Sequence, residues 1–243
     1  MIPNFLDLSH INCLDSFLIA LTGWTSLVIV NLANNKLFGK IPSSIGSLYQ
    51  LETFDLCNNN FSGEIPWSLG NCSALQFVDL SYNRFSGIIP AWIGERLRSL
   101  AFLLLRSNDF NGDVPFQLCW LTNIMLLDLS NNNLSESIPS YIDKASVMWK
   151  GMECDYGDGQ LPWSMSHLNF LNTLNLSYNN FSGRIPLSTQ MQTFDASAFV
   201  DNPELCGLPL RPTCLEEEKS KSKPTDCGGK DNKRRRSRIL EIV

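Results

Sequence analysis

The sequence has little of what metal-dependent and nucleotide-dependent enzymes require. It contains two histidines in 243 residues, His10 and His167, and its eight cysteines include no C-x-x-C pair. This spacing argues against a zinc site. A Gly-rich phosphate loop, a G-x-S-x-G nucleophile motif and the motifs of a protein kinase are also absent from the sequence. We expect a chain without catalytic residues, without a cofactor and without a metal site.

Long apolar runs and strong charge are missing as well. Residues 16–33 are fairly apolar but contain Thr, Gly and Asn, which argues against a membrane span. Residues 1–15 lack a basic region and are interrupted by Asp7 and Asp15, so no signal peptide is recognisable. The net charge is −5, and the tail from Leu215 holds nine basic and six acidic residues (+3), so the rest carries about −8. An acidic chain of this kind does not suit nucleic acid as a ligand.

What the sequence does contain is a repeat of about 24 residues. Its clearest copy is residues 75–90, LQFVDLSYNRFSGIIP, in which apolar positions surround Asn83, Gly87 and Pro90. A fixed period in the twenties with an L-x-L core is the signature of a leucine-rich-repeat solenoid. The prolines at this phase are Pro42, Pro66, Pro90, Pro115, Pro139, Pro162 and Pro186, with gaps of 24, 24, 25, 24, 23 and 24.

Each column of the repeat has a physical role. Alternate residues of the L-x-L strand point into one shared core. The asparagine that follows can bond main-chain groups of its own and adjacent coils, and the glycine permits a tight or left-handed backbone. The strand pairs directed into the core are Val30/Leu32, Phe54/Leu56, Val78/Leu80, Leu103/Leu105, Leu127/Leu129 and Leu174/Leu176. The predicted asparagine ladder is Asn35, Asn59, Asn83, Asn108, Asn132 and Asn179. The glycine column is Gly39, Gly63, Gly87, Gly112, Gly159 and Gly183.

We therefore predict an α/β-type leucine-rich-repeat solenoid, a right-handed horseshoe or superhelix. A parallel β-sheet would line its concave face, and its convex side would be irregular or 3-10 helical. Because no coil can bury its own apolar side, several coils must stack. The predicted parts are a degenerate uncapped coil (1–23), five repeats (24–139), an irregular segment (140–167), a last repeat (168–190), a C-terminal cap (191–214) and a disordered charged tail (215–243).

Four of these parts need comment. Leu6 and Leu8 stand 24 residues before Val30 and Leu32, so the chain is expected to start inside a longer solenoid. The irregular segment keeps one repeat's length but lacks L-x-L and Asn, and it is either a degenerate coil or an inserted recognition loop. In the cap, Phe194 and Phe199 can cover the open apolar end. The basic run of residues 233–238 is expected to be solvated tail, with a nuclear signal or a membrane-surface patch as alternatives.

Several outward-facing side chains on the concave strands form a candidate binding surface. Adjacent strands lie about 4.8 Å apart, so these side chains would lie close together. Exposed aromatic residues beside an arginine are typical of binding hot spots, although scattered apolar residues also occur on surfaces without a role. The predicted ligand-binding residues are Phe77, Asp79, Tyr82, Phe102, Leu104 and Arg106.

The cysteines and sequons point to a secreted protein. Cys206 and Cys214, flanked by prolines, are predicted to form a disulfide that closes a small loop. The pairing of Cys13, Cys57, Cys72, Cys119, Cys154 and Cys227 stays open. Five N-x-S/T sequons predict glycosylation at Asn60, Asn71, Asn133, Asn175 and Asn180, although the L-x-L-S-x-N-N-x-S pattern also creates sequons as a by-product.

Three motifs resemble those of plant proteins. The pattern L-x-G-x-I-P-x-x-L/I-G is similar to the plant-specific repeat, and NPELCGLPLRPTC resembles the C-terminal cap of plant receptor-like proteins and receptor kinases. MWKG resembles the island segment of receptor-like proteins, with the spacings Tyr141 to Lys150-Gly151 and Lys150 to Tyr156. Relatives often carry a cysteine at the position of Tyr141 that can bridge to the position of Cys119, and this chain lacks it.

The resemblance implies a membrane-anchored ectodomain that senses an extracellular peptide or protein ligand, in defence or development. It would signal through a co-receptor leucine-rich-repeat kinase that docks near the C-terminal coils, and have no catalysis of its own. The family's membrane helix is missing from this chain, as is its signal peptide. Two alternatives therefore stay open, a secreted inhibitor of a cell-wall-degrading enzyme and a nonfunctional receptor fragment.

Overall fold

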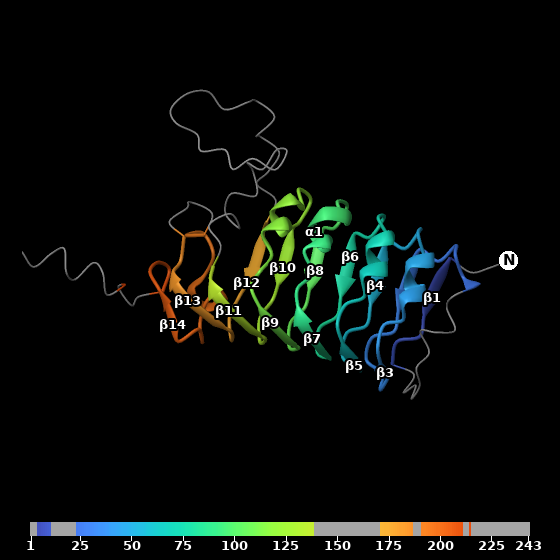
Figure 1. Ribbon diagram of the computed structural model, residues 1–243, viewed down its shortest axis with the longest axis horizontal. Helices are drawn as coiled ribbons and strands as arrows, with labels where there is room; N and C mark the ends of the chain where they lie inside the picture. Colours follow the sequence, from blue (N-terminus) through green and yellow to red (C-terminus); the bar gives the residue numbers. More distant parts are fainter. Residues whose placement is uncertain (1–3, 11–22, 139–170, 187–190, 211–213, 215–243) are drawn as a thin grey trace, which may run out of the picture.

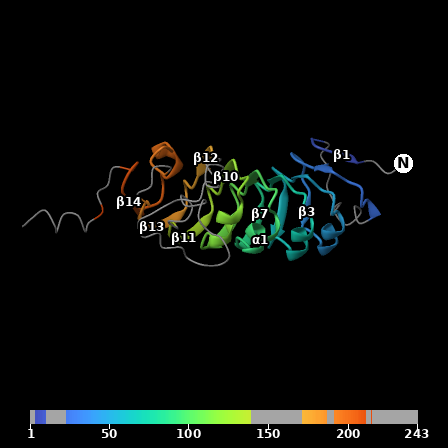
Figure 2. The same cartoon turned by 90° about the horizontal axis from the view of Figure 1, so that it is seen from above.

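The computed structural model describes residues 4–10, 23–138, 171–186, 191–210 and 214. In this part of the chain, coils stack side by side into an elongated body that runs from β1 at one end to β14 at the other (Figures 1 and 2). The predicted solenoid is confirmed.

The first sheet contains one short strand from each coil. All neighbouring strands are parallel, and Leu6 pairs with Val30 across β1 and β2, 24 residues apart, as the repeat predicts. The middle residue of β2, β4, β6, β8, β10 and β12 is buried in the core, while the residues on either side of it are more accessible. The strands, in sheet order, are β1 (Phe5–Asp7), β2 (Ile29–Asn31), β4 (Thr53–Asp55), β6 (Phe77–Asp79), β8 (Phe102–Leu104), β10 (Leu126–Asp128) and β12 (Thr173–Asn175).

A second parallel sheet, which the sequence analysis did not predict, runs beside the first. It is built from the F-S-G part of each repeat, where the column glycines Gly39, Gly63, Gly87, Gly112 and Gly183 have φ of +72° to +97°. This confirms the predicted left-handed backbone at those glycines. The strands are β3 (Phe38–Gly39), β5 (Asn60–Gly63), β7 (Arg84–Ile88), β9 (Asp109–Gly112), β11 (Asn133–Ser137), β13 (Asn180–Arg184) and β14 (Glu204–Cys206).

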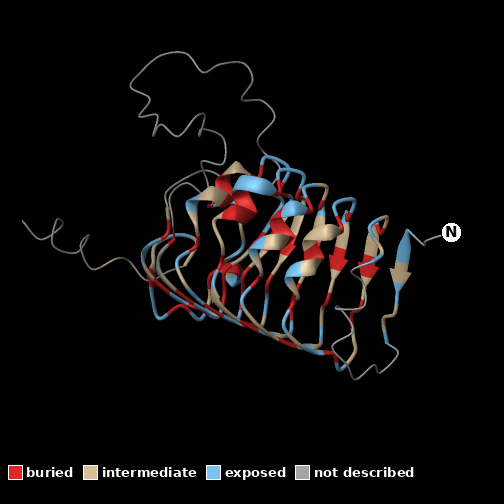
Figure 3. Cartoon of the chain, turned by 45° about the vertical axis from the view of Figure 1, so that its right-hand side comes forward, coloured by how far each residue is buried: buried red, intermediate tan, exposed pale blue. Residues whose placement is uncertain are grey.

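Short helices follow Pro42, Pro66, Pro90 and Pro115, as predicted for the convex side (Figure 3). Pro42, Pro66 and Pro115 are the N-cap residues of three of these helices, a position at which no N–H donor is needed. A Cβ on Gly94 would collide with the Gln117 carbonyl, so these helices pack too closely for a larger residue there. They are η2 (Ser43–Ser47), η3 (Trp67–Asn71), α1 (Trp92–Arg96) and η4 (Phe116–Trp120), and the cap adds η7 (Ala196–Ala198).

The core is a continuous column of apolar side chains between the two sheets and the helices. Phe61, Phe85 and Phe110 stack along it, with ring centroids 6.3 and 6.4 Å apart and the rings within 12° of parallel. At the C-terminal end Phe199 is fully buried and Phe194 packs against the core. The sequence predicted both phenylalanines as cover for that end.

The asparagine ladder satisfies main-chain groups of successive coils. Asn108 shows its geometry: Nδ2 donates to the carbonyls of Leu80, Leu105 and Arg106 at 2.9, 3.1 and 3.2 Å, and Oδ1 accepts from the Phe85 N–H at 2.9 Å. The six predicted asparagines all donate in this way. Asn202 of the cap is a further member, with bonds to Leu176, Phe199 and Val200, which sequence reasoning missed. Its spacing of 23 residues from Asn179 was the available signal.

Each ladder asparagine follows a residue in the left-handed region, which the sequence analysis also missed. Such a backbone is unfavourable for most L-residues and is tolerated best by asparagine. Here the bonded asparagine on its C-terminal side holds it in place. These residues are Asn34, Asn58, Tyr82, Ser107, Asn131, Tyr178 and Asp201, with φ of 53° to 57°.

The step from β10 to β12 is unlike the others. Leu127 pairs directly with Leu174, and Asn179 Nδ2 donates to the Leu129 carbonyl at 3.0 Å. This step takes 47 residues, whereas the step from Leu103 to Leu127 takes 24. The segment 140–167 lies outside the described residues, but the first sheet has no strand between β10 and β12. The two strands on either side of this segment are therefore direct neighbours in the first sheet.

Candidate functional site

Phe77, Tyr82, Phe102, Leu104 and Arg106, which we call the concave patch, come together on β6, β8 and the turns after them. Phe77 and Phe102 are register partners on neighbouring strands, and their ring centroids are 5.8 Å apart with the planes tilted by 42°. Both rings are half-buried. Neighbouring aromatic rings on one sheet face form a rigid apolar surface that costs little conformational entropy to use. The structure thus places these predicted residues side by side.

Tyr82 and Arg106 extend this surface beyond the strand ends. Tyr82 is 47% exposed, and the Arg106 Cζ lies 5.5 Å from the centroid of its ring. The Tyr82 N–H donates to the Arg106 carbonyl at 2.9 Å, which ties the two turns together. A guanidinium over an aromatic face is attracted by the ring quadrupole. Among the described residues no carboxylate forms an ion pair with Arg106, so its charge is available to a ligand.

Leu104 interrupts a polar column on the concave face. In the other coils an aspartate or asparagine at this position accepts the N–H two residues later, as Asp79 Oδ1 does from Ser81 at 2.8 Å and Asp128 Oδ1 from Ser130 at 3.0 Å. Leu104 has no acceptor, and the Arg106 N–H has no hydrogen-bond partner among the described residues. The patch therefore combines apolar surface with one unpaired main-chain donor. The remaining members of the polar column are Asp7, Asn31, Asp55 and Asn175.

Asp55 and Asp79 make the surface next to Phe77 acidic. Burial raises the pKa of the Asp79 carboxyl, against the hydrogen bonds from Ser81 that lower it, and the charge of Asp128 raises it further. Burial likewise raises the pKa of Asp55, against the N–H of Cys57, and the charge of Asp79 adds to the rise. Asp79, the sixth predicted ligand-binding residue, lies on β6 opposite Leu104.

Cys57 lies between these two carboxylates in space. Burial, followed by the charges of Asp79 and Asp55, raises the pKa of its thiol to about 12, so the thiol stays protonated at neutral pH. The potential ligand atoms of Asp55, Cys57 and Asp79 lie within 4.8 Å of one another. Three groups, one of them a protonated thiol, fall short of the four ligands of a structural zinc site. The raised pKa of its thiol also makes Cys57 a poor nucleophile.

The predicted disulfide between Cys206 and Cys214 is present, with the two Cα atoms 5.3 Å apart. It closes the cap beside β14. Cys57, Cys72 and Cys119 are free thiols, and burial is the main cause that raises the pKa of Cys72 and of Cys119 to about 11. The other cysteines and the predicted motif residues Tyr141, Lys150, Gly151 and Tyr156 lie outside the described residues.

The predicted glycosylation sites fall into two groups. Asn60, Asn133 and Asn180 are exposed first residues of β5, β11 and β13, and Asn71 is exposed at the end of η3. Asn175 differs, because it lies on β12 and its Oδ1 accepts both the N–H and the hydroxyl of Ser177, at 3.2 and 2.8 Å. Ser177, which completes that sequon, is only 4% exposed.

A second aromatic surface, on the convex side, was missed by sequence reasoning. Arg96 lies over the ring of Trp67 at 4.6 Å and Arg98 over that of Trp120 at 5.1 Å. Phe116 meets Trp120 edge-on with centroids 5.6 Å apart. The signal was in the sequence, since Trp67 and Phe116 both directly follow a repeat proline.

Comparison with known proteins agrees with this architecture. The sequence model of the Leucine Rich Repeat family matches residues 26–48, 50–72, 74–95, 123–145 and 170–190. Residues 96–122, which carry Phe102, Leu104 and Arg106, lie outside these matches. None of the helices in the described residues is long and apolar enough to cross a membrane.

Individual relatives come from plants. A polygalacturonase inhibitor of Arabidopsis thaliana is 43% identical over 58 residues, 23% of this chain and 16% of that protein. The Arabidopsis receptor kinase HAESA, solved with the peptide hormone IDA and the co-receptor SERK1, matches at 32% identity and a TM-score of 0.69, covering 85% of this chain and 30% of that one. The BIR2 ectodomain from Arabidopsis thaliana matches at 33% identity and a TM-score of 0.50, covering 63% of this chain and 68% of that one. The chain thus spans less than a third of the first two relatives. It belongs to the leucine-rich-repeat family, with repeats like those of plant receptor ectodomains.

Proposed function

We propose that the chain is the ligand-recognition part of a plant receptor-like protein and binds an extracellular peptide or protein on its concave face. The observation that carries this proposal is the concave patch, in which two paired aromatic rings, an exposed tyrosine and an arginine lie together, and no described carboxylate pairs with the arginine. Clustered aromatic and arginine side chains are the groups that contribute most binding energy in interfaces.

The solved relatives support this function. HAESA was captured with a peptide hormone and a co-receptor. By analogy, we propose a co-receptor leucine-rich-repeat kinase as the second partner, docking near the C-terminal coils, and signalling in defence or development at the plasma membrane. The fold is that of a binding module, and we propose no catalytic activity, cofactor or nucleic-acid ligand.

Truncating the patch should abolish binding without unfolding the protein. Peptides selected from a displayed random library on the wild-type chain serve as the probe, and titration calorimetry measures their affinity. Phe102→Ala and Arg106→Ala should each weaken the selected peptides at least tenfold, because hot-spot truncations cost about 2 kcal/mol or more. The unfolding free energy should change by no more than about 0.5 kcal/mol for the exposed Arg106.

The matched control is Trp67→Ala, which removes an exposed aromatic residue that is stacked by an arginine but lies on the convex side. It should leave the affinity unchanged. Equal affinity of the Phe102→Ala, Arg106→Ala and wild-type chains for every selected peptide would refute the concave patch as the binding surface.

The secreted chain should carry N-glycans at four of its five sequons. Expressed in plant cells behind an added signal peptide, the chain is expected to carry N-glycans at Asn60, Asn71, Asn133 and Asn180 but not at Asn175, whose amide and serine are bonded to each other. Enzymatic deglycosylation in heavy-oxygen water followed by peptide mass spectrometry locates each site. Ser62→Ala should remove one glycan and Ser177→Ala none. A glycan at Asn175 would contradict the prediction.

The second candidate is a secreted inhibitor of a cell-wall-degrading enzyme. It is favoured by the polygalacturonase inhibitor of Arabidopsis thaliana, which is 43% identical over the matched residues. A panel of fungal polygalacturonases assayed with and without the chain decides between the two candidates. Inhibition that is lost in Arg106→Ala would establish the inhibitor, whereas unaffected activity across the panel would leave the receptor function.

A further inference from the structure

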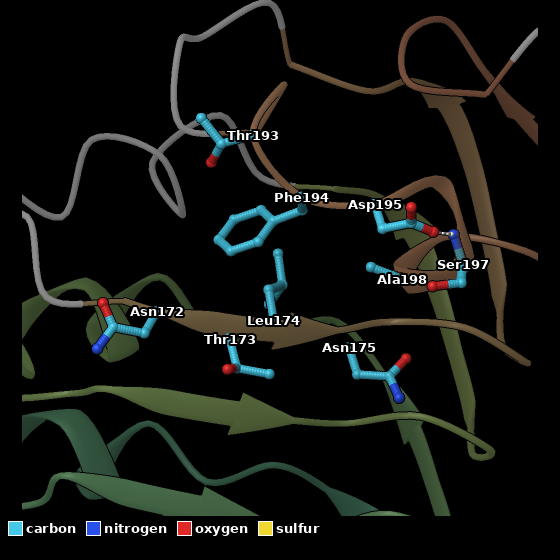
Figure 4. Close-up of a pocket in the computed structure, with 9 residues that line it drawn as sticks. All are labelled: Asn172, Thr173, Leu174, Asn175, Thr193, Phe194, Asp195, Ser197 and Ala198. Atoms are coloured by element: carbon cyan, nitrogen blue, oxygen red, sulfur yellow. Dashed lines mark hydrogen bonds between the residues drawn. The ribbon is translucent and has the colours of Figure 1, made fainter.

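The first sheet ends at β12, and the cap does not continue it. Where the next coil would supply a strand, residues 193–198 form a turn and the short helix η7, so a gap opens beside β12 (Figure 4). This gap is a cavity of about 360 Å³. In Figure 4 the Phe194 ring lies over Leu174, with Asp195 and Ser197 farther along the same side. The second sheet is different, because β14 pairs with β13 and completes it.

The main chain of β12 leaves unpaired groups facing the cavity. Thr173 and Asn175 face β10: the Thr173 N–H donates to the Met125 carbonyl at 3.1 Å, and the Asn175 carbonyl accepts from Leu129 at 2.9 Å. The main-chain groups of Leu176 face the cap instead, and its N–H donates to the Ala198 carbonyl at 2.8 Å. Leu174 faces the same way, and its N–H and C=O have no hydrogen-bond partner among the described residues.

The described residues of η7 use their own main-chain groups elsewhere. The Ala198 N–H donates to the Asp195 carbonyl and the Phe199 N–H to the Ala196 carbonyl, as in a 3-10 turn. The Ser197 N–H donates to the Asp195 carboxylate at 2.8 Å. Leu174 is only 3% exposed, so its unpaired groups lie where bulk solvent has little access. Buried main-chain groups are nearly always paired in folded proteins.

We propose that this cavity binds an extended peptide segment, which adds to β12 as a short strand and pairs with the N–H and C=O of Leu174. Strand addition at a free sheet edge is a general mode of peptide recognition, in which main-chain bonds give affinity and side-chain pockets give selectivity. Phe194 supplies an apolar wall. The Ser197 N–H bonded to Asp195 lowers the pKa of that carboxyl, so a negative charge lies at the entrance and favours a basic residue in the peptide. The site is separate from the concave patch and does not depend on it.

The test uses the full chain and a phage-displayed library of seven-residue peptides, which is selected on the Arg106→Ala variant so that peptides of the concave patch are not enriched. Ser197→Trp fills the cavity from an exposed position and keeps the backbone, while Gln192→Trp places the same side chain on the cap outside the cavity. Peptides should be enriched, bind the wild-type chain and Gln192→Trp, and lose at least tenfold in affinity on Ser197→Trp. Arg106→Ala should bind them as the wild type does, which separates this site from the concave patch.

Amide hydrogen exchange reports on the edge directly. In the free chain the Leu174 amide should exchange at least tenfold faster than those of Thr173 and Asn175, and a selected peptide should slow it at least tenfold while leaving the other two unchanged. Two results would overturn the inference. One is a Leu174 amide already protected in the free chain, which would mean that the chain's own residues fill the edge. The other is a set of selected peptides that bind Ser197→Trp and the wild type equally.

Discussion

Replacing Phe85 by alanine should lower the free energy of unfolding by about 3–5 kcal/mol, the usual cost of removing a buried phenylalanine. Phe85 is fully buried and stacks between Phe61 and Phe110 of the two adjacent coils. The cavity would therefore lie on two inter-coil interfaces at once. Because each coil is stabilised mainly by its neighbours, we expect the whole stack to unfold at a lower urea concentration. Circular dichroism during urea unfolding measures the shift.

Phe38→Ala is the matched control, since Phe38 lies on β3 of the same sheet but is 49% exposed. It should cost less than about 1 kcal/mol, because little of its apolar area is removed from water. The loss in free energy of unfolding for Phe85→Leu should lie between those of Phe85→Ala and Phe38→Ala. If Phe85→Ala and Phe38→Ala unfold at the same urea concentration, the phenylalanine stack does not hold the coils together.

Replacing Asn108 by alanine should destabilise the chain by about 1–3 kcal/mol. The change removes one acceptor and one donor group that serve four main-chain partners. It leaves the Phe85 N–H unpaired, and the Leu80 carbonyl keeps only its bond from Asn83. Each buried group left without a partner costs about 1–3 kcal/mol. Asn108 is 8% exposed, so water cannot readily take over these bonds. Urea unfolding and hydrogen exchange of the Phe85 amide both report the loss.

Two further variants sharpen this result. Asn108→Asp keeps the acceptor for Phe85 but turns a carboxylate toward three carbonyl oxygens, so it should be at least as destabilising as alanine. Asn123→Ala removes a single exposed bond to the Arg98 carbonyl and should change stability by less than about 0.5 kcal/mol. Equal stabilities of Asn108→Ala and Asn123→Ala would show that the ladder contributes no net stability.

The candidate site could be predicted only in part. The period placed Phe77 and Phe102 on outward positions of adjacent strands, and the structure pairs them. The period also placed Tyr82 and Arg106 close together, but it did not indicate the guanidinium over the ring, because the turn there depends on a left-handed Tyr82 held by Asn83 and by the next coil. Nor did the period indicate that the Arg106 N–H would have no partner among the described residues. That became clear once the structure showed the Asp79 and Asp128 carboxylates accepting the equivalent N–H in the adjacent coils, a role that the Leu104 side chain cannot fill.

The sequence by itself determined the period, the buried column, the asparagine ladder and the cap disulfide. These follow from local alternation and from chemistry that recurs every 24 or so residues, so one coil predicts the next. Only the tertiary structure decided that β10 and β12 are neighbours, that the F-S-G segments form a second sheet, and that the edge of β12 stays open. The reason is physical: hydrogen bonding between strands depends on which coil lies alongside, and wherever the repeat is interrupted the sequence no longer specifies that neighbour.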